Sequence, residues 1–237
     1  MNVDVGVIGG SGMYELAPVV EQVGPVAICE VDGRAVAFLN RHGTGHRVPP
    51  HAVDYRANVR ALADLGVTRI FATFACGSLV PGLGPGTLVV PDQLIDRTRG
   101  RIDTFFDSFE NGPRHAEFAD PYDAQARQAL LTNTTDAVDG GTVVVIDGPR
   151  FATRAESRWY RSIGATLINM TQYPEAVLAR ELDIAYAAIG LITDYDAGVD
   201  DRPDIAPVTV EAVLAEFERH LPRLRAAVLA AATVTAT

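Results

Sequence analysis

Short apolar segments rich in β-branched residues alternate with amphipathic segments along most of this chain, and this alternation constrains its fold more than any other feature. Alternating strands and helices are typical of an α/β sheet with helices packed on it. Strands are predicted over 3–8, 69–78, 86–96, 141–151, 166–171 and 184–198. Helices are predicted over 53–66, 121–137, 153–164, 174–183 and 209–234, the last with a kink at Pro222.

The first half of the chain adds antiparallel character to this pattern. Residues 26–43 predict a hairpin around Asp32 and Gly33, a strong turn pair. Residues 97–122 have no regular period, and we interpret them as a long functional loop. These features predict an α/β fold with a central mixed sheet flanked by helices, in a single domain over residues 1–237.

Composition limits the partners of such a domain. Hydrophobic residues make up 48% of the chain, enough for a full core, and the formal net charge is −10. An acidic surface argues against nucleic-acid or anionic-membrane binding, although local donors can still hold a small anion. The start of the chain lacks the pattern of a signal peptide, which favours the cytoplasm. Cys29 and Cys76 lie in apolar segments and are predicted to be buried, reduced thiols.

A glycine-rich turn, Gly10-Ser11-Gly12, follows the first predicted strand. Backbone N–H groups in such a turn can hold a phosphate, and the Ser11 hydroxyl adds a donor. A dinucleotide fingerprint needs a third glycine and a following helix, whereas Glu15 occupies the place of that glycine. We therefore favour a free phosphate, and keep a nicotinamide-dependent oxidoreductase and a purely structural turn as alternatives.

A basic segment follows the strand that ends near residue 40. Arg41 and His42 end this strand, and His46, Arg47 and His51 come soon after. A metal site is one interpretation, but glycines and prolines break the helix on which a zinc site of this kind would depend. A guanidinium and an imidazole also suit a phosphate, which favours an anion site. Solvated surface charge remains the third interpretation.

Polar residues also follow three other predicted strands. The segment "TFACGS" over 73–78 ends in a turn that could complete a phosphate site. Asn169, Met170 and Thr171 end another strand, where an open α/β sheet faces its ligand.

Asp194 and Asp196 alternate at the end of the last predicted strand, so we expect both side chains to point the same way. Two buried carboxylates on one face require donors or a proton, and a purine offers both. A Mg²⁺ site that includes Asp200 and Asp201 is the alternative, and helix capping a further one.

Together these stretches resemble the methylthioadenosine phosphorylases of the trimeric purine nucleoside phosphorylase family. The motifs "IGGSG", "NRHGTGH", "ACGSL", "GPRFATRAE", "NMTQYPE" and "TDYD" occur in the order typical of that family over nearly the whole chain. The resemblance implies a purine nucleoside phosphorylase-like fold with a partly barrel-like sheet. It also implies cleavage of 5'-methylthioadenosine by phosphate, a co-substrate, to adenine and 5-methylthioribose-1-phosphate, with no metal or organic cofactor.

The resemblance also implies roles for individual residues. Phosphate would be held by Ser11, Arg41, His42, Ala75 and Thr171. The purine and ribose would meet Phe151, Met170, Asp194, Tyr195 and Asp196, with Asp194 and Asp196 as the catalytic pair. The methylthio group would meet Val210, Val213 and Leu214, and His115 would come from a neighbouring subunit of a homotrimer.

Two positions depart from the family pattern and bear on specificity. Phe74 stands where relatives commonly carry a small hydroxyl residue beside the sugar, and Ala152 replaces a Ser of some adenine-specific members. Members that prefer 6-oxopurines usually carry Asn in place of one carboxylate, so Asp194 and Asp196 favour a 6-aminopurine. Phosphorylases with another base or 5' preference, a nucleosidase that uses water, and a non-catalytic nucleotide-binding module remain alternatives.

Overall fold

The computed structural model describes residues 3–110, 112–198, 202 and 204–234. In this part of the chain, eleven strands form one mixed sheet. They are β1 Val5–Gly9, β2 Val19–Val23, β3 Val26–Val31, β4 Arg34–Asn40, β5 Arg69–Ser78, β6 Leu88–Val90, β7 Gln93–Asp96, β8 Val138–Asp139, β9 Thr142–Val145, β10 Leu167–Asn169 and β11 Ala185–Asp194.

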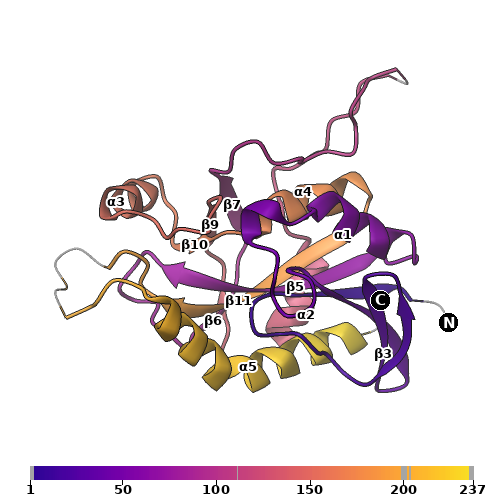
Figure 1. Cartoon of the computed structure of the whole chain (residues 1–237), viewed down its shortest axis with the longest axis horizontal. Helices are drawn as coiled ribbons and strands as arrows, with labels where there is room; N and C mark the ends of the chain where they lie inside the picture. Colours follow the sequence, from indigo (N-terminus) through magenta and orange to yellow (C-terminus); the bar gives the residue numbers. More distant parts are fainter. Residues whose placement is uncertain (1–2, 111, 199–201, 203, 235–237) are drawn as a thin grey trace.

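Helices cover both faces of this sheet (Figure 1). They are α1 Tyr55–Ala63, α2 Ala124–Thr132, α3 Arg154–Ser162, α4 Gln172–Glu181 and α5 Val210–Thr233, with a short 3₁₀ helix over Pro50–Ala52. In Figure 1, α1 and α4 lie above the sheet, and the long yellow helix α5 lies below it. The predicted α/β class with a central mixed sheet is therefore confirmed.

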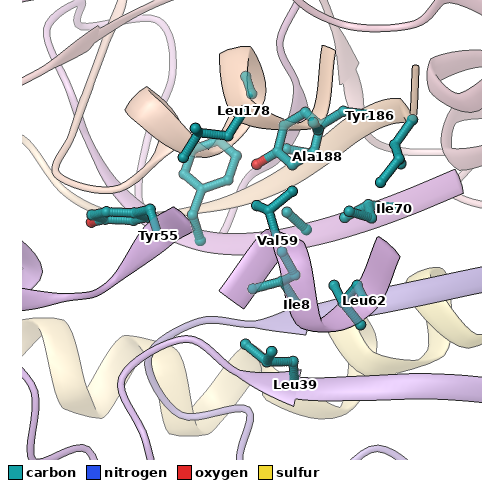
Figure 2. Packing of buried hydrophobic residues seen from close by; sticks show 14 of the residues in the cluster. Ile8, Leu39, Tyr55, Val59, Leu62, Ile70, Leu178, Tyr186 and Ala188 are labelled. Carbon is teal, nitrogen blue, oxygen red and sulfur yellow. The ribbon is translucent and has the colours of Figure 1, made fainter. Parts of the chain in front are cut away.

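The two central strands, β5 and β11, each feed both faces because side chains of a strand alternate. On β5, Ile70 and Ala72 pack with α1 and α4, whereas Phe71 packs with α2 and α5. Figure 2 shows the first of these cores, where Val59 and Leu62 of α1 lie near Leu178 of α4 and the sheet. Fully burying one such aliphatic side chain contributes about 1.5–3 kcal/mol.

The predicted hairpin is confirmed, since β3 and β4 pair antiparallel with Val31 opposite Arg34. The predicted strand over 86–96 is divided at Pro91 into β6 and β7, which pair with different neighbours. Proline lacks the N–H that an uninterrupted ladder needs. The predicted helix over 121–137 ends at Thr132. Residues 97–110 and 112–122 contain no helix or strand, as expected for a long loop.

Strand direction brings the predicted site residues together. β1 runs parallel to β4 and β5, and β5 runs parallel to β11, so the carboxyl ends of these four strands lie at one edge. β10 runs antiparallel to β5, with Ile168 opposite Gly77, so it begins beside the end of β5 and its carboxyl end points back along that strand, where Asn169 reaches Ala75. The segments after β1, β4, β10 and β11 therefore meet around the end of β5.

Two smaller observations complete the fold. Cys29 and Cys76 are both buried and free, as predicted. Among the described residues, no helix combines the length and the apolar character needed to cross a membrane.

Candidate active site

A cavity of about 260 Å³ lies at this edge of the sheet. Most of the residues predicted from sequence line it: Ser11, Arg41, His42, Phe74, Ala75, Phe151, Met170, Thr171, Asp194, Asp196 and Val213. The cavity is lined from segments that are distant in sequence, so the fold gathers hydrogen-bond donors and two carboxylates in one place.

The glycine-rich turn forms one wall of the cavity. The backbone N–H of Gly10 donates to the Thr73 hydroxyl on β5 at 3.0 Å, which fixes the turn to the central strand. Gly12 has φ of 80°, and a Cβ at that position would lie 2.3 Å from the ring of Phe217. After this turn the chain continues into β2 rather than a helix. The turn thus lacks the helix that a dinucleotide site requires.

Substitution of Gly10 is expected to disturb the part of the cavity formed by the glycine-rich turn and Arg41, where the sequence predicts a phosphate. A Cβ on Gly10 would lie 2.9 Å from Nη1 of Arg41 and 2.5 Å from the Thr73 carbonyl oxygen. Gly10→Ala should therefore weaken phosphate binding about 10- to 100-fold, the loss of one or two charge-assisted hydrogen bonds. Isothermal calorimetry with phosphate measures this. Gly82→Ala is the control because a Cβ there meets nothing within 4 Å. Equal phosphate affinity in both variants would contradict the assignment.

Arg41 lines the cavity and is almost completely buried, with 2% of its surface exposed. Its Nε and Nη2 donate to the two carboxylate oxygens of Glu175 at 2.7 Å each, and Nη1 donates to the Thr73 carbonyl at 2.8 Å. Tyr186 donates a further hydrogen bond to Glu175. Burial opposes the charge of Arg41, but the Glu175 carboxylate outweighs it and raises the pKa of Arg41. The guanidinium is thus held in one orientation.

The end of β10 is fixed by Asn169. Its side-chain oxygen accepts from the backbone N–H groups of Thr171 and Gln172 at 2.6 and 2.8 Å, and its amide donates to the Ala75 carbonyl at 3.0 Å. Thr171 is buried at the N-terminus of α4, and its hydroxyl makes no capping bond. This turn places Thr171 at the cavity, where its hydroxyl makes only long contacts, of 3.5 Å, with the Asn169 amide.

Arg101, from the long loop, supports the same turn and was not predicted from sequence. Its guanidinium donates to the carbonyls of Met170, Tyr173 and Asp147. It also lies over the ring of Tyr55, with Cζ 5.2 Å from the ring centre. One buried cation therefore holds together the segments that follow β9 and β10.

Arg101→Met should loosen this wall of the cavity. Because carbonyls that now bind a cation would lose their partner, we expect a loss of about 2–4 kcal/mol in the free energy of unfolding. Chemical denaturation monitored by circular dichroism measures it. Arg99→Met, in which an exposed side chain is changed, should stay within about 0.5 kcal/mol of the parent. A comparable loss in both variants would contradict the supporting role of Arg101.

The two carboxylates at the end of β11 both line the cavity, but they are held differently. Asp194 is the last residue of β11 and accepts from the Thr193 hydroxyl and the Asp196 backbone N–H, both at 2.7 Å. Asp196 lies beyond the strand with φ of 50°. The predicted strand alternation for Asp196 is therefore wrong, and a left-handed turn brings its side chain to the cavity.

Both carboxyl groups are easier to protonate than usual. Burial raises the pKa of Asp194, although the Thr193 hydroxyl and the Asp196 N–H oppose this effect. Burial likewise raises the pKa of Asp196, opposed by hydrogen bonds from Ser157 and from the backbone of Ala152 and Ala197. Desolvation disfavours the charged form of an acid. A ligand that brings a donor or shares a proton would relieve this cost.

The described residues include no group of three or more His, Cys, Asp or Glu that could hold a metal ion. Asp200 and Asp201, which the sequence analysis considered as magnesium ligands, lie outside the described residues. Cys76 lines the cavity, but burial raises the pKa of its thiol well above the ordinary value, with the charge of Asp194 as the second cause. A thiol in that state is a poor nucleophile.

Some predicted residues are not among those that line the cavity. The Tyr195 hydroxyl donates to the Pro81 carbonyl, and Ala152 contributes its backbone to Asp196. Val210 and Leu214 are each 56% exposed on α5, whereas Val213 reaches the cavity. His115 is exposed and packs edge-on against Phe109. Figure 1 shows that part of the long loop between β7 and α2 projects from the body of the molecule.

Several residues that shape the site gave little signal in the sequence. Ser157 of α3 donates to the Asp196 carboxylate, and this contact depends on how α3 packs. Glu175 belongs to the segment "QYPE", where its spacing from Arg41 reveals nothing of their pairing. His46 lines the cavity, with its ring centre 4.3 Å from that of His42.

Comparison with known proteins places these features in context. Residues 4–233 match the family model described as "Phosphorylase superfamily". The chain is 53% identical to the S-methyl-5'-thioadenosine phosphorylase of Mycolicibacterium smegmatis, over 92% of this chain and 86% of that protein. It is 45% identical to the purine nucleoside phosphorylase of Streptomyces coelicolor, over 94% and 85%.

A solved structure shares the fold. The methylthioadenosine phosphorylase of Schistosoma mansoni in complex with adenine superposes with a TM-score of 0.86 at 36% identity. The match covers 97% of this chain and 91% of that one.

Proposed function

Since the chain belongs to the phosphorylase superfamily, we propose that it is a nucleoside phosphorylase that acts on 5'-methylthioadenosine. Phosphate would cleave the N-glycosidic bond to give adenine and 5-methylthioribose-1-phosphate, a pentosyl transfer. One observation carries the proposal: a single cavity holds both an anion wall and a pair of protonatable carboxylates, Asp194 and Asp196. We use the name anion wall for the lining residues Ser11, Arg41, His42, Ala75 and Thr171.

The anion wall suits inorganic phosphate as co-substrate. Arg41 is held in place by Glu175, and its outer N–H groups, with the hydroxyls of Ser11 and Thr171, would bind the phosphate oxygens. His42 and the backbone of Ala75 also line this wall. A fixed guanidinium and hydroxyls would orient phosphate for attack on C1', and positioning of this kind can contribute several kcal/mol.

The opposite wall suits a purine and its sugar. Phe151 would stack on the base, Met170 would pack beneath the ribose, and Phe74 and Val213 would enclose the apolar 5' group. Asp194 and Asp196 would bind the N7 and 6-amino edge. Tyr195, Val210 and Leu214 do not line the cavity of this single chain, so their contacts with a substrate are not part of the proposal.

The chemistry requires a stabilised leaving group. Cleavage leaves a positively charged sugar and an anionic purine, and a proton delivered to N7 neutralises the latter. General acid catalysis of this kind contributes about 10²- to 10⁴-fold. The raised pKa values of Asp194 and Asp196 support this role because each carboxyl holds a proton more readily than usual. Neither step calls for a metal or an organic cofactor.

We further propose a homotrimer in the cytoplasm. The exposed His115, in the long loop between β7 and α2, would complete the substrate site of a neighbouring subunit. Sedimentation equilibrium of the purified protein tests the trimer. His115→Ala should then raise KM for the nucleoside, and a monomeric enzyme with unchanged KM would contradict this part of the proposal.

A substrate panel tests the main proposal. Methylthioadenosine, adenosine, inosine and methylthioinosine are incubated with and without phosphate, and base release is followed by chromatography. Methylthioadenosine with phosphate should react fastest. Turnover that ignores phosphate would identify a nucleosidase, and no release from any nucleoside would exclude the enzyme. Faster release of hypoxanthine would favour the second candidate, a 6-oxopurine phosphorylase, since a 42% identical relative from Pyrococcus furiosus is named a 6-oxopurine nucleoside phosphorylase.

A further inference from the structure

His42 has only one ring nitrogen left for a ligand, because the other is hydrogen-bonded to the backbone of Val48. Nδ1 lies 2.8 Å from the backbone carbonyl oxygen of Val48. A carbonyl oxygen can only accept a hydrogen bond, so Nδ1 must carry the hydrogen. The ring nitrogen Nε2 is therefore the one whose state depends on the charge of the imidazole.

The surroundings of His42 keep the imidazole neutral. Burial lowers the pKa of His42 to about 4, and the positive charge of Arg41 and then His46 add to this effect, against the hydrogen bond to Val48. At neutral pH the ring thus holds one hydrogen, on Nδ1, and Nε2 has a free lone pair. The sequence predicts that this imidazole donates to phosphate. In the structure, the contact between Nδ1 and the Val48 carbonyl leaves Nε2 of the neutral ring as an acceptor.

An acceptor in an anion site is informative because the groups predicted to hold the anion beside it are donors. Arg41, Ser11 and Thr171 line the same cavity and carry donors. The Arg41 charge is already paired with Glu175, so hydrogen bonds rather than net charge must select the anion. An oxyanion that carries no hydrogen cannot donate to Nε2. The lone pair of an anion oxygen would then face the lone pair of Nε2, and the buried Nε2 would have no hydrogen-bond donor.

We propose that Nε2 of His42 accepts a hydrogen bond from the P–OH group of hydrogen phosphate. The site therefore distinguishes a protonated tetrahedral oxyanion from sulfate, which has the same shape and, at slightly alkaline pH, the same charge as hydrogen phosphate but no hydrogen. This inference rests on the proposed function, since it refines the same phosphate site. Specificity here comes from an interaction that the wrong anion cannot make.

Calorimetric titration of the unliganded protein with phosphate and with sulfate tests the proposal. Phosphate should bind about tenfold or more tightly than sulfate, the effect expected from one unpaired buried acceptor. His42→Asn retains a side-chain N–H that can reach the Val48 carbonyl but removes Nε2, so the ratio of the two affinities should fall toward one. His51→Asn is the matched control, because His51 is exposed in the same segment, and its ratio should equal that of the parent.

A second measurement uses the parent protein alone, in case His42→Asn fails to fold. In ¹⁵N-histidine-labelled protein at neutral pH, Nε2 of His42 should show the chemical shift of an unprotonated nitrogen. Phosphate should change that shift, and sulfate should not.

Equal binding of phosphate and sulfate, or a protonated Nε2, would overturn the inference while leaving phosphate-dependent adenine release untouched. Absence of phosphate binding together with absence of adenine release would instead overturn the proposed function, and the inference with it. An unchanged affinity ratio in a folded His42→Asn would overturn the inference alone.

Discussion

Asp194→Asn is expected to lower kcat for adenine release about 10²- to 10⁴-fold, because an amide cannot deliver a proton to N7 of the leaving purine. The change is nearly isosteric. The Asn oxygen can still accept from the Asp196 N–H, and the Thr193 hydroxyl can turn to accept from the amide. Steady-state kinetics with methylthioadenosine and saturating phosphate measure the effect.

The same variant should be at least as stable as the parent at neutral pH. Burial raises the pKa of Asp194 above the ordinary 3.8, so the folded protein binds a proton more tightly than the unfolded chain. Stability from this group is therefore fully present below the ordinary pKa and is lost as pH rises through the folded pKa. Asp194→Asn has no carboxyl group to ionise and does not suffer this loss. Denaturation measured across this pH range should show that the free energy of unfolding of the variant, relative to the parent, increases with pH.

The base preference of Asp194→Asn supplies the internal control. In the proposed complex the two oxygens of Asp194 lie at N7 and at the neighbouring C6 group. A carbonyl at C6 requires a donor, which the Asn amide provides, so the ratio of inosine to adenosine turnover should rise. Unchanged kcat on methylthioadenosine would contradict the catalytic role, and a large loss of stability at neutral pH would contradict the protonation argument.

Glu175→Ala is expected to have the largest effect on stability, a loss of about 3–5 kcal/mol in the free energy of unfolding. The side chains of Arg41 and Glu175 are 1% and 0% exposed, so removal of the carboxylate leaves a buried cation without its partner. The Tyr186 hydroxyl also loses its shorter hydrogen bond, at 2.7 Å, and keeps only the one to Gln172 at 3.3 Å. Glu175→Gln should lose less, because its amide oxygen can still accept from Arg41. Urea denaturation measures all three proteins.

The matched control is Glu156→Gln, which removes the charge of a surface pair with Arg150. The side chains of Arg150 and Glu156 are 65% and 29% exposed, and Gln can still complete the capping box of α3. This change should cost no more than about 1 kcal/mol. Equal losses at Glu175 and Glu156 would show that the buried pair is not important for the fold.

Local sequence patterns could predict much of this structure. Hydrophobic periodicity identified most elements, and strand ends identified where Arg41 and Asp194 would gather, because parallel strands place their carboxyl ends at one edge. Thr171 reaches the same place from β10, which runs antiparallel to β5. The short exposed strand β2 was not predicted. All five of its residues are exposed, so it lacks the alternation that marks a half-buried strand.

Other features depend on tertiary contacts that spacing alone does not encode. The partner of Asp196 is Ser157, on a helix 39 residues away in sequence. Arg101 comes from a segment without periodicity, yet it binds carbonyls at the ends of two strands. The hydrogen-bonding state of His42 depends on the Val48 carbonyl, whose position is set by the intervening loop with its left-handed residues Gly43, Gly45 and His46.

The last helix, α5, contacts both the cavity and the glycine-rich turn. Val213 lines the cavity, and one turn later Phe217 fills the space left by the missing side chain of Gly12 in the glycine-rich turn. These two side chains lie on the same face of one rigid rod. Any mutation that tilts α5 to admit a bulkier 5' substituent must also move the ring of Phe217, which packs against Gly12. In the proposed complex, a change in 5' preference that moves α5 would therefore also shift the turn that faces the phosphate.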